Sequence, residues 1–322
     1  MKTVLVTGCA GFIGSHLTEC LLARGDRVIG IDSFEDFYPR PLKERNLANA
    51  IANPGFELVE ANIVDLAVRN GSGHSRLHDL ISASDIVIHM AAQAGVRSSW
   101  GESFEIYLKN NVHATQLLLE AARGSDIEKF VYSSSSSVYG ESAEMPLTET
   151  AAPHPISPYG VTKLAGENLA VLYARAFAVP TVSLRYFTVY GPRQRPDMAF
   201  QRFITLMLAD KPIEVYGDGL QVRDFTYVDD IVSGILRSVD SPHGSVFNLG
   251  GGSKVSLRDA IALLEDLIGT PAGITWGDRR AGDVTATWAS LTAAGTIGYV
   301  PEVDLRTGLA RHVEWARECV SS

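Results

Sequence analysis

Short apolar segments recur along the first half of the chain, separated by longer stretches with a different hydrophobic spacing. Six segments are almost entirely apolar and rich in β-branched residues, as in parallel strands covered on both faces: TVLVTG, RVIGID, FELVEAN, DIVIHMAA, KFVYSSS and TVSLRYF. Between them, apolar residues at three- and four-residue intervals predict amphipathic helices over about 12–24, 103–123 and 158–177. Strands that alternate with such helices imply right-handed crossovers, so the pattern predicts an α/β fold with a doubly wound parallel sheet.

This alternation breaks after about residue 187, where glycine- and proline-rich turns with the sequences GP, GDG and GGG become frequent. Residues 222–239 again have the pattern of a strand and a helix, so they are expected to rejoin the sheet. The sequence therefore predicts a first domain of residues 1–187 plus about 222–243. Residues 188–221 and 244–322 are expected to form a smaller α/β domain.

The composition is that of an ordinary globular protein and excludes several classes of function. The 322 residues are 46% hydrophobic and carry 28 basic against 37 acidic side chains, a formal net charge of −9. The chain has no basic run that favours nucleic acid, and no apolar run reaches the roughly 18 residues that span a membrane. Cys9, Cys20 and Cys319 form no paired motif, which fits a reducing cytoplasm and argues against a metal site.

A glycine motif directly follows the first predicted strand and precedes the first predicted helix. Gly8, Gly11 and Gly14 have the spacing GxxGxxG, which allows a tight turn and a close approach of backbone to a pyrophosphate. The next predicted strand ends at Asp32, and an acid there binds both hydroxyls of an adenosine ribose and repels a 2′-phosphate. This order predicts a Rossmann-type site for NAD rather than NADP. A structural turn and a solvated carboxylate are the alternatives.

A tyrosine and a lysine four residues apart stand at the start of the helix predicted over 158–177. Tyr159 and Lys163 lie on one helix face, and Pro158 favours a helix that begins there. A phenol has a pKa of about 10, so tyrosine is a base at neutral pH only beside positive charge, such as an ammonium group or an oxidised nicotinamide. The strand that ends in Ser133–Ser137 places hydroxyl groups at the ligand-binding edge of the sheet. A flexible turn is the alternative for these serines.

Several longer motifs together resemble one family, the extended short-chain dehydrogenase/reductases of the NAD-dependent epimerase/dehydratase type that act on nucleotide sugars. The resemblance covers nearly the whole chain and rests on TGCAGFIGSHL, HMAAQAGVR, NNVHATQLLLEAA, SSSSSVYG, SPYGVTK, LRYFTVYGP, VYGDGLQVRDFTYVDD and RRAGDV. It implies that the first domain binds NAD and that the second binds a UDP-sugar. It also implies a homodimer, in which helices 103–122 and 158–177 form a bundle between subunits.

The resemblance assigns roles to individual residues. It implies that Tyr159 is the catalytic base, that Lys163 lowers its pKa and binds the nicotinamide ribose, and that Ser135 hydrogen-bonds the reacting hydroxyl. The implied cofactor contacts are Gly8, Gly11, Phe12, Ile13, Gly14, Asp32, Asn62, Ile63, Ala91, Ala92, Gln93, Tyr159 and Lys163. The implied uridine diphosphate contacts, with arginines suited to a diphosphate, are Val215, Tyr216, Gln221, Arg223, Arg280 and Asp283. Surface ion pairs of the two arginines with Asp224 or Asp283 are the alternative.

One position departs from the family pattern. Where many members have Gly-Asp-Ile after the third strand, this chain has Ala61-Asn62-Ile63. The side-chain oxygen of Asn62 still accepts a hydrogen bond from an adenine amine, although its amide group adds donors.

The reaction follows from carboxylates that the chain lacks. Related 4,6-dehydratases place Asp-Glu after the catalytic hydroxyl, and related decarboxylases place a glutamate just before Val-Tyr-Gly. Here the slots hold Ser136 and Ser137, so neither chemistry has its carboxylate. The resemblance therefore implies reversible oxidation at C4 with return of the hydride to the opposite face, which is 4-epimerisation of a UDP-sugar.

The substituent at C6 of the sugar is predicted from one stretch, YFTVYGPRQRPDMAF. This stretch resembles UDP-glucuronate 4-epimerases more than UDP-glucose enzymes, which tend to carry Asn where Thr188 stands. Arg195 lies where those relatives are expected to meet the sugar carboxylate, whereas a solvated basic loop containing Arg193 and Arg195 is the alternative. The predicted reaction converts UDP-glucuronate to UDP-galacturonate. UDP-glucose as substrate, an NAD-dependent binding protein without turnover, and a dinucleotide fold without substrate are the alternatives.

Overall fold

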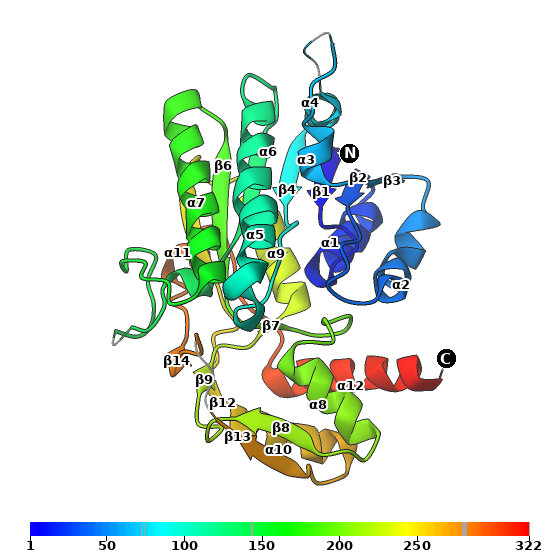
Figure 1. The fold of residues 1–322 in the computed structure, drawn as a ribbon, viewed down its shortest axis with the longest axis vertical. Helices are drawn as coiled ribbons and strands as arrows, with labels where there is room; N and C mark the ends of the chain where they lie inside the picture. Colours follow the sequence, from blue (N-terminus) through cyan, green and yellow to red (C-terminus); the bar gives the residue numbers. More distant parts are fainter. Residues whose placement is uncertain (72, 74, 143, 279–281, 322) are drawn as a thin grey trace.

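The computed structural model describes residues 1–71, 73, 75–142, 144–278 and 282–321. Figure 1 shows a sheet flanked by helices in its upper part and a smaller group of helices and strands below. The upper part contains the first half of the chain and the lower part most of the second half. This is the α/β architecture that the hydrophobic pattern predicted.

Seven parallel strands form the sheet, in the order β11-β6-β5-β4-β1-β2-β3. The order reverses between β1 and β4, which is where sheets of this kind bind ligands at their carboxyl ends. The six predicted strands are all present, and β11 is the seventh. Their bounds are Thr3–Thr7 for β1, Arg27–Asp32 for β2, Phe56–Glu60 for β3, Ile86–His89 for β4, Lys129–Ser135 for β5, Thr181–Tyr186 for β6 and Ser245–Leu249 for β11.

Consecutive residues of a strand supply two separate cores, one on each face of the sheet. On β1, Val4 and Val6 belong to one cluster and Leu5 to the other, because side chains alternate along a strand. The first face packs against α1 (Phe12–Ala23) and α9 (Val228–Ser238), with α2 (Arg40–Ile51) beside α1. The second packs against α3 (Ile63–Leu66), α4 (Arg76–Ser82), α6 (Ala114–Ala122) and α7 (Pro158–Phe177).

The helix expected over 103–123 is present without a break from Phe104 to Ala122, but its middle is π-helical. Its residues form α5 (Phe104–Tyr107), a π-helical segment η3 (Leu108–His113) and α6. The helix expected over 158–177 has those bounds, because Ser157 caps its N-terminus by accepting from the Gly160 N–H at 3.1 Å.

The second half of the chain builds a smaller α/β region from short, separately paired strands. The strand pairs are β10–β7 and β13–β8, and β9 lies between β12 and β14. The strand bounds are Val189–Tyr190 for β7, Ile213–Tyr216 for β8, Val222–Arg223 for β9, Thr226–Tyr227 for β10, Val255–Ser256 for β12, Ile274–Gly277 for β13 and Ala286–Thr287 for β14. The helices are α8 (Ala199–Leu208), α10 (Leu257–Ile268), α11 (Thr292–Gly295) and α12 (Leu305–Ser321).

One predicted domain boundary needs correction. Residues 244–322 were assigned to the smaller domain, but β11 pairs with β6 and completes the large sheet. The expected strand within 222–239 is instead two short strands outside that sheet: β9 pairs with β12 and β14, and β10 pairs with β7. The apolar run of β11 packs on α9 and so rejoins the first region by a long-range contact that periodicity does not reveal.

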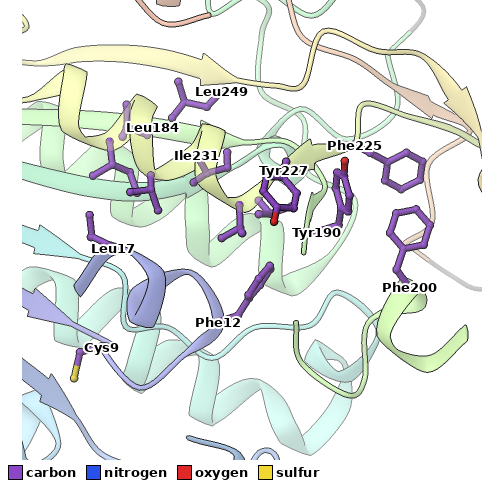
Figure 2. Packing of buried hydrophobic residues seen from close by; sticks show 14 of the residues in the cluster. Cys9, Phe12, Leu17, Leu184, Tyr190, Phe200, Phe225, Tyr227, Ile231 and Leu249 are labelled. Atoms are coloured by element: carbon purple, nitrogen blue, oxygen red, sulfur yellow. The ribbon is translucent and has the colours of Figure 1, made fainter. Parts of the chain in front are cut away.

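The two regions share one hydrophobic cluster. Figure 2 shows Phe12 of α1 pointing toward the rings of Tyr227 and Tyr190, with Phe225 and Phe200 beyond them. The Phe200 and Phe225 ring centroids are 4.6 Å apart. Aromatic residues thus join the smaller region to the side of the sheet that carries α1.

Among the described residues, no helix is long and apolar enough to cross a membrane. Within the same part of the chain, no group of His, Cys, Asp and Glu side chains has the arrangement of a metal site.

Candidate active site

In the glycine motif that joins β1 to α1, the positions of Gly8 and Gly14 are packed too tightly to accept a side chain. Gly8 has a φ of +73°, and a Cβ there would lie 2.8 Å from the backbone nitrogen of Ala91 on the neighbouring strand connection. A Cβ on Gly14 would lie 2.1 Å from the carbonyl oxygen of Gly8. Gly11 caps α1 without a side-chain hydrogen bond, so the first N–H groups of the helix point into the loop. This cradle fits a pyrophosphate, as the glycine spacing predicted.

Asp32 lies at the end of β2, beside this loop, and is not a solvated carboxylate. It accepts hydrogen bonds from the backbone N–H groups of Ala10 at 3.0 Å and Phe34 at 2.9 Å. Burial raises the pKa of the Asp32 carboxyl, and the two N–H groups oppose that shift. Its position fits the two hydroxyls of an adenosine ribose.

Asn62 is partly committed to structure. Its side-chain oxygen accepts from the Val64 N–H at 2.9 Å and caps α3, and its amide donates to Glu35 at 3.1 Å. Asn62 and Ile63 line the cleft, and the predicted adenine contact depends on the second lone pair of the Asn62 oxygen.

One cleft runs from Asp32 to Tyr159 and contains every position predicted to contact the cofactor. Predicted contact residues that line it are Gly8, Gly11, Phe12, Ile13, Gly14, Asp32, Asn62, Ile63, Ala91, Ala92, Gln93, Tyr159 and Lys163. Their individual contacts stay predictions. The cradle, the acid and the cleft together fit NAD.

Tyr159 and Lys163 lie on one face of α7, opposite the end of β5. Burial raises the pKa of the Tyr159 phenol, whereas its hydrogen bond with Ser135 and the charge of Arg195 act to lower it. Lys163 donates to the Ser133 carbonyl at 2.7 Å, and burial lowers the pKa of its ammonium to about 8. The sequence predicted that Lys163 and the nicotinamide supply the positive charge near the Tyr159 phenol. Arg195 is a further source of positive charge there.

Arg195 and Arg193 do not form a solvated basic loop. Arg195 lines the cleft and forms a two-point ion pair with Asp197, from Nε and Nη2, each bond 2.9 Å long. Arg193 binds both carboxylate oxygens of Glu19, at 2.8 and 2.9 Å. The Arg195 side chain is only 19% exposed and lines the cleft, so its guanidinium is largely shielded from bulk water but accessible from the cleft.

A second pocket begins at the same serine segment and extends toward the smaller region. Predicted substrate residues that line it are Ser136, Ser137, Thr188, Arg223 and Asp283. Arg223 donates to the carbonyls of Val222 at 2.9 Å and Val284 at 2.8 Å, whereas Asp224 is buried and accepts from the Gly251 and Ala289 N–H groups. The alternative ion pair of Arg223 with Asp224 is therefore wrong.

The structure leaves three predicted uridine contacts outside both pockets. The Val215 side chain is buried in the hydrophobic core, and Gln221 donates to the Tyr216 carbonyl at 3.4 Å. The ring of Tyr216 lies under the guanidinium of Arg97, at 4.5 Å from its centroid. Arg280 lies outside the described residues.

Arg97 and Tyr107 are site residues that the sequence analysis did not single out. Arg97 forms an ion pair with Asp283 at 2.7 Å, next to the second pocket. Tyr107 packs edge-on against Tyr159, with ring centroids 6.3 Å apart, and its hydroxyl holds the 94–98 loop through Ser98 at 2.7 Å. Arg97 stands in the motif HMAAQAGVR, but only tertiary structure brings it beside Asp283.

The fold and the cleft define an enzyme that binds NAD. Residues 4–250 match the profile of the NAD dependent epimerase/dehydratase family, and the chain belongs to this family.

Similar proteins and solved structures align over nearly all of the chain. The uncharacterised UDP-glucose epimerase YtcB of Bacillus subtilis is 43% identical over 316 residues, 97% of each chain. The UDP-glucuronate 4-epimerase of Thermodesulfobacterium geofontis is 37% identical over 99% of this chain and 97% of its own. The crystal structure of UDP-glucuronic acid 4-epimerase from Bacillus cereus, in complex with UDP-glucuronic acid and NAD, has a TM-score of 0.93 and 42% identity, covering 98% of this chain and 99% of that one.

Proposed function

We propose that the protein is a UDP-sugar 4-epimerase with resident NAD, and that UDP-glucuronate, converted to UDP-galacturonate, is its substrate. The observation that carries the proposal is that Tyr159 and Arg195 line the same cleft and that Ser135 and Arg195 both act on the Tyr159 phenol. The Ser135 hydroxyl and the Arg195 charge both act to lower the pKa of the Tyr159 phenol. The solved relative from Bacillus cereus, which binds UDP-glucuronic acid and NAD, supports the same substrate.

The chain supplies the proton chemistry and the positioning. Tyr159 accepts the proton of the C4 hydroxyl and later returns it to C4 oxygen, while Ser135 donates a hydrogen bond to that oxygen. Lys163, anchored on the Ser133 carbonyl, would hold the nicotinamide ribose. Bound NAD supplies the reversible hydride chemistry at C4. The cofactor contacts named above complete the proposed site.

Arg195 decides between the two candidate sugars. Oxidation at C4 of a glucuronate gives a β-keto acid, which loses CO₂ when its C5–carboxylate bond aligns with the carbonyl π system. A guanidinium fixed by Asp197, together with hydroxyls of Ser136, Ser137 and Thr188, would hold that carboxylate out of alignment. Nη1 of Arg195 makes no hydrogen bond within the described part of the chain, so it is open to a ligand.

UDP-glucose is the second candidate, favoured by the 43% identity to a protein named UDP-glucose epimerase. Separate incubation with UDP-glucuronate, UDP-glucose and UDP-xylose, with products identified by NMR, tests both candidates. The proposal expects UDP-galacturonate as the dominant product. Faster turnover of UDP-glucose would replace the proposed substrate, and no turnover of any UDP-sugar, with NAD bound, would favour a binding protein.

The UDP moiety is proposed to occupy the second pocket, near Arg223 and Asp283. A homodimer through η3 and α7 is part of the proposal, since large apolar side chains are exposed there. They are Leu108, Val161, Leu172 and Phe177, between 44% and 55% exposed. A cytoplasmic location is also proposed, because no cysteine of the described chain forms a disulfide.

A further inference from the structure

A buried carboxylate lies in line with the catalytic pair on α7. Tyr159, Lys163 and Glu167 follow one another at four-residue intervals, so their side chains share a helix face. Glu167 accepts from Arg185 Nε at 3.0 Å, from Arg185 Nη2 at 2.6 Å and from Ser134 Oγ at 2.6 Å. The Arg185 and Glu167 side chains are only 5% and 4% exposed.

The partners of Arg185 extend this contact across the sheet. Its Nη1 donates to the Tyr139 hydroxyl at 2.7 Å, and that hydroxyl donates to Asn248 at 2.7 Å. The network therefore joins α7 to β5, β6 and β11, and it includes Ser134, the neighbour of Ser135 on β5. A buried ion pair pays a large desolvation penalty, so stability alone is a weak reason for placing one here.

Ser134 stands between two residues of the catalytic machinery. The Ser133 carbonyl accepts from Lys163, and the Ser135 hydroxyl acts on the Tyr159 phenol and lowers its pKa. Ser134 and Arg185 are partners in the register of β5 and β6. Any shift of α7 along β5 would therefore stretch the contacts of Lys163 and Tyr159 together.

We propose that the Glu167–Arg185 ion pair, with Ser134, is a positioning device that fixes α7 against the end of β5 and so holds Tyr159 on Ser135. The proposal rests on the proposed function in that Tyr159 is the base. Because Arg185 balances the charge of Glu167, the device adds directional hydrogen bonds near Lys163 without a net charge. None of its three residues is proposed to touch the sugar.

Two variants separate position from charge. Ser134→Ala removes one hydrogen bond of the device and keeps both charges, whereas Glu167→Gln keeps the shape but leaves Arg185 positive. Ser183→Ala is the matched control, because the Ser183 hydroxyl is buried on β6 and has no hydrogen-bond partner among the described residues. The NAD-loaded proteins are compared by the pH dependence of kcat/KM, by KM, and by titration of the tyrosinate absorbance against Tyr159→Phe.

If the device positions Tyr159, both variants should shift the pH dependence of kcat/KM and the tyrosinate titration in the same direction. A loosened bond from Ser135 raises the pKa of Tyr159, so the acidic limb of kcat/KM and the tyrosinate titration move to higher pH. We expect kcat to fall by about tenfold or more, as for a misplaced catalytic group, with KM changed less than about twofold. Ser183→Ala should match the wild type, and thermal unfolding below the assay temperature must be absent in each variant.

The opposite pattern would overturn the inference. If charge alone mattered, Glu167→Gln would move the limb to lower pH, since the unbalanced Arg185 stabilises a phenolate, and Ser134→Ala would leave it in place. Ser134→Ala retains the ion pair, so it keeps the test decisive if Glu167→Gln does not fold. The tyrosinate titration needs no substrate. Inactivity of the wild type on every UDP-sugar would therefore overturn the proposed function without affecting this result.

Discussion

The dinucleotide half of the site and the substrate half are built in different ways. The cradle and the acid of the first come from one continuous segment, from Gly8 to Asp32, and the cradle presents backbone groups of a glycine loop; residues of later segments complete the lining of the cleft. The second draws Ser136, Thr188 and Arg223 from distant parts of the chain, and polar side-chain contacts hold it. A site made of backbone is specified by a local motif, whereas a site made of side chains depends on how remote loops meet.

The junction of the two halves is where the largest effect is expected. Tyr159→Phe keeps the ring and removes the proton acceptor, so kcat should fall by about 10²–10⁴-fold, with bound NAD retained. Tyr173→Phe is the control, because this tyrosine lies on the same helix and its hydroxyl bonds Glu120, away from the cleft. Steady-state assays of both variants check the prediction. More than about a tenth of the rate in Tyr159→Phe would disprove the assigned base.

Arg195→Ala tests the substrate half. The stabilisation of the transition state for UDP-glucuronate should fall by about 1.5–3 kcal/mol, the usual contribution of a hydrogen bond to a charged group. UDP-glucose has no carboxylate, so its smaller loss should come from the raised pKa of Tyr159 and should recover at higher pH. Ratios of kcat/KM for the two sugars measure the difference, and released NADH would report loss of CO₂. Equal losses on both sugars at every pH would return the preference to UDP-glucose.

Gly14→Ala tests the dinucleotide half. A Cβ 2.1 Å from the Gly8 carbonyl forces the loop open, and overpacking of this kind costs about 1–3 kcal/mol, or about 5- to 150-fold in NAD affinity. Gly295→Ala is the control, since within the described part of the chain a Cβ there meets nothing within 4 Å. NAD released from the denatured proteins is quantified by chromatography. Full NAD content in Gly14→Ala would show that the loop yields more easily than the structure indicates.

Two buried histidines, one in each region, give the smallest expected effect. Burial lowers the pKa of His89, on β4, and of His312, on α12, from 6.5 to about 3. The unfolded chain then binds more protons below pH 6.5, so each histidine lowers the free energy of unfolding by about 1.4 kcal/mol per pH unit as the pH falls.

Replacing either histidine by glutamine should reduce this acid slope by the same amount in denaturant titrations at several pH values. Because one hydrophobic cluster joins the regions, both variants should act on a single unfolding transition. Two separate transitions, each sensitive to one variant, would mean that the regions unfold independently.

The sequence by itself determined the sheet and the dinucleotide half. Six strands and the helix over Pro158–Phe177 followed from apolar periodicity and from Pro158 at the helix start, because these signals act over a few residues. The positions of Gly8, Gly14 and Asp32 followed from one motif, since the backbone of a strand–loop–helix unit fixes them locally.

Only the tertiary structure decided the rest. It placed β11 in the large sheet, Arg97 on Asp283 and Glu167 on Arg185, through contacts between residues far apart in the chain. It also placed the Val215 side chain in the hydrophobic core and not in the second pocket, because β8 points this side chain inward. Such contacts depend on the packing of whole elements, and no local pattern of hydrophobic and polar residues encodes which distant side chain will meet which.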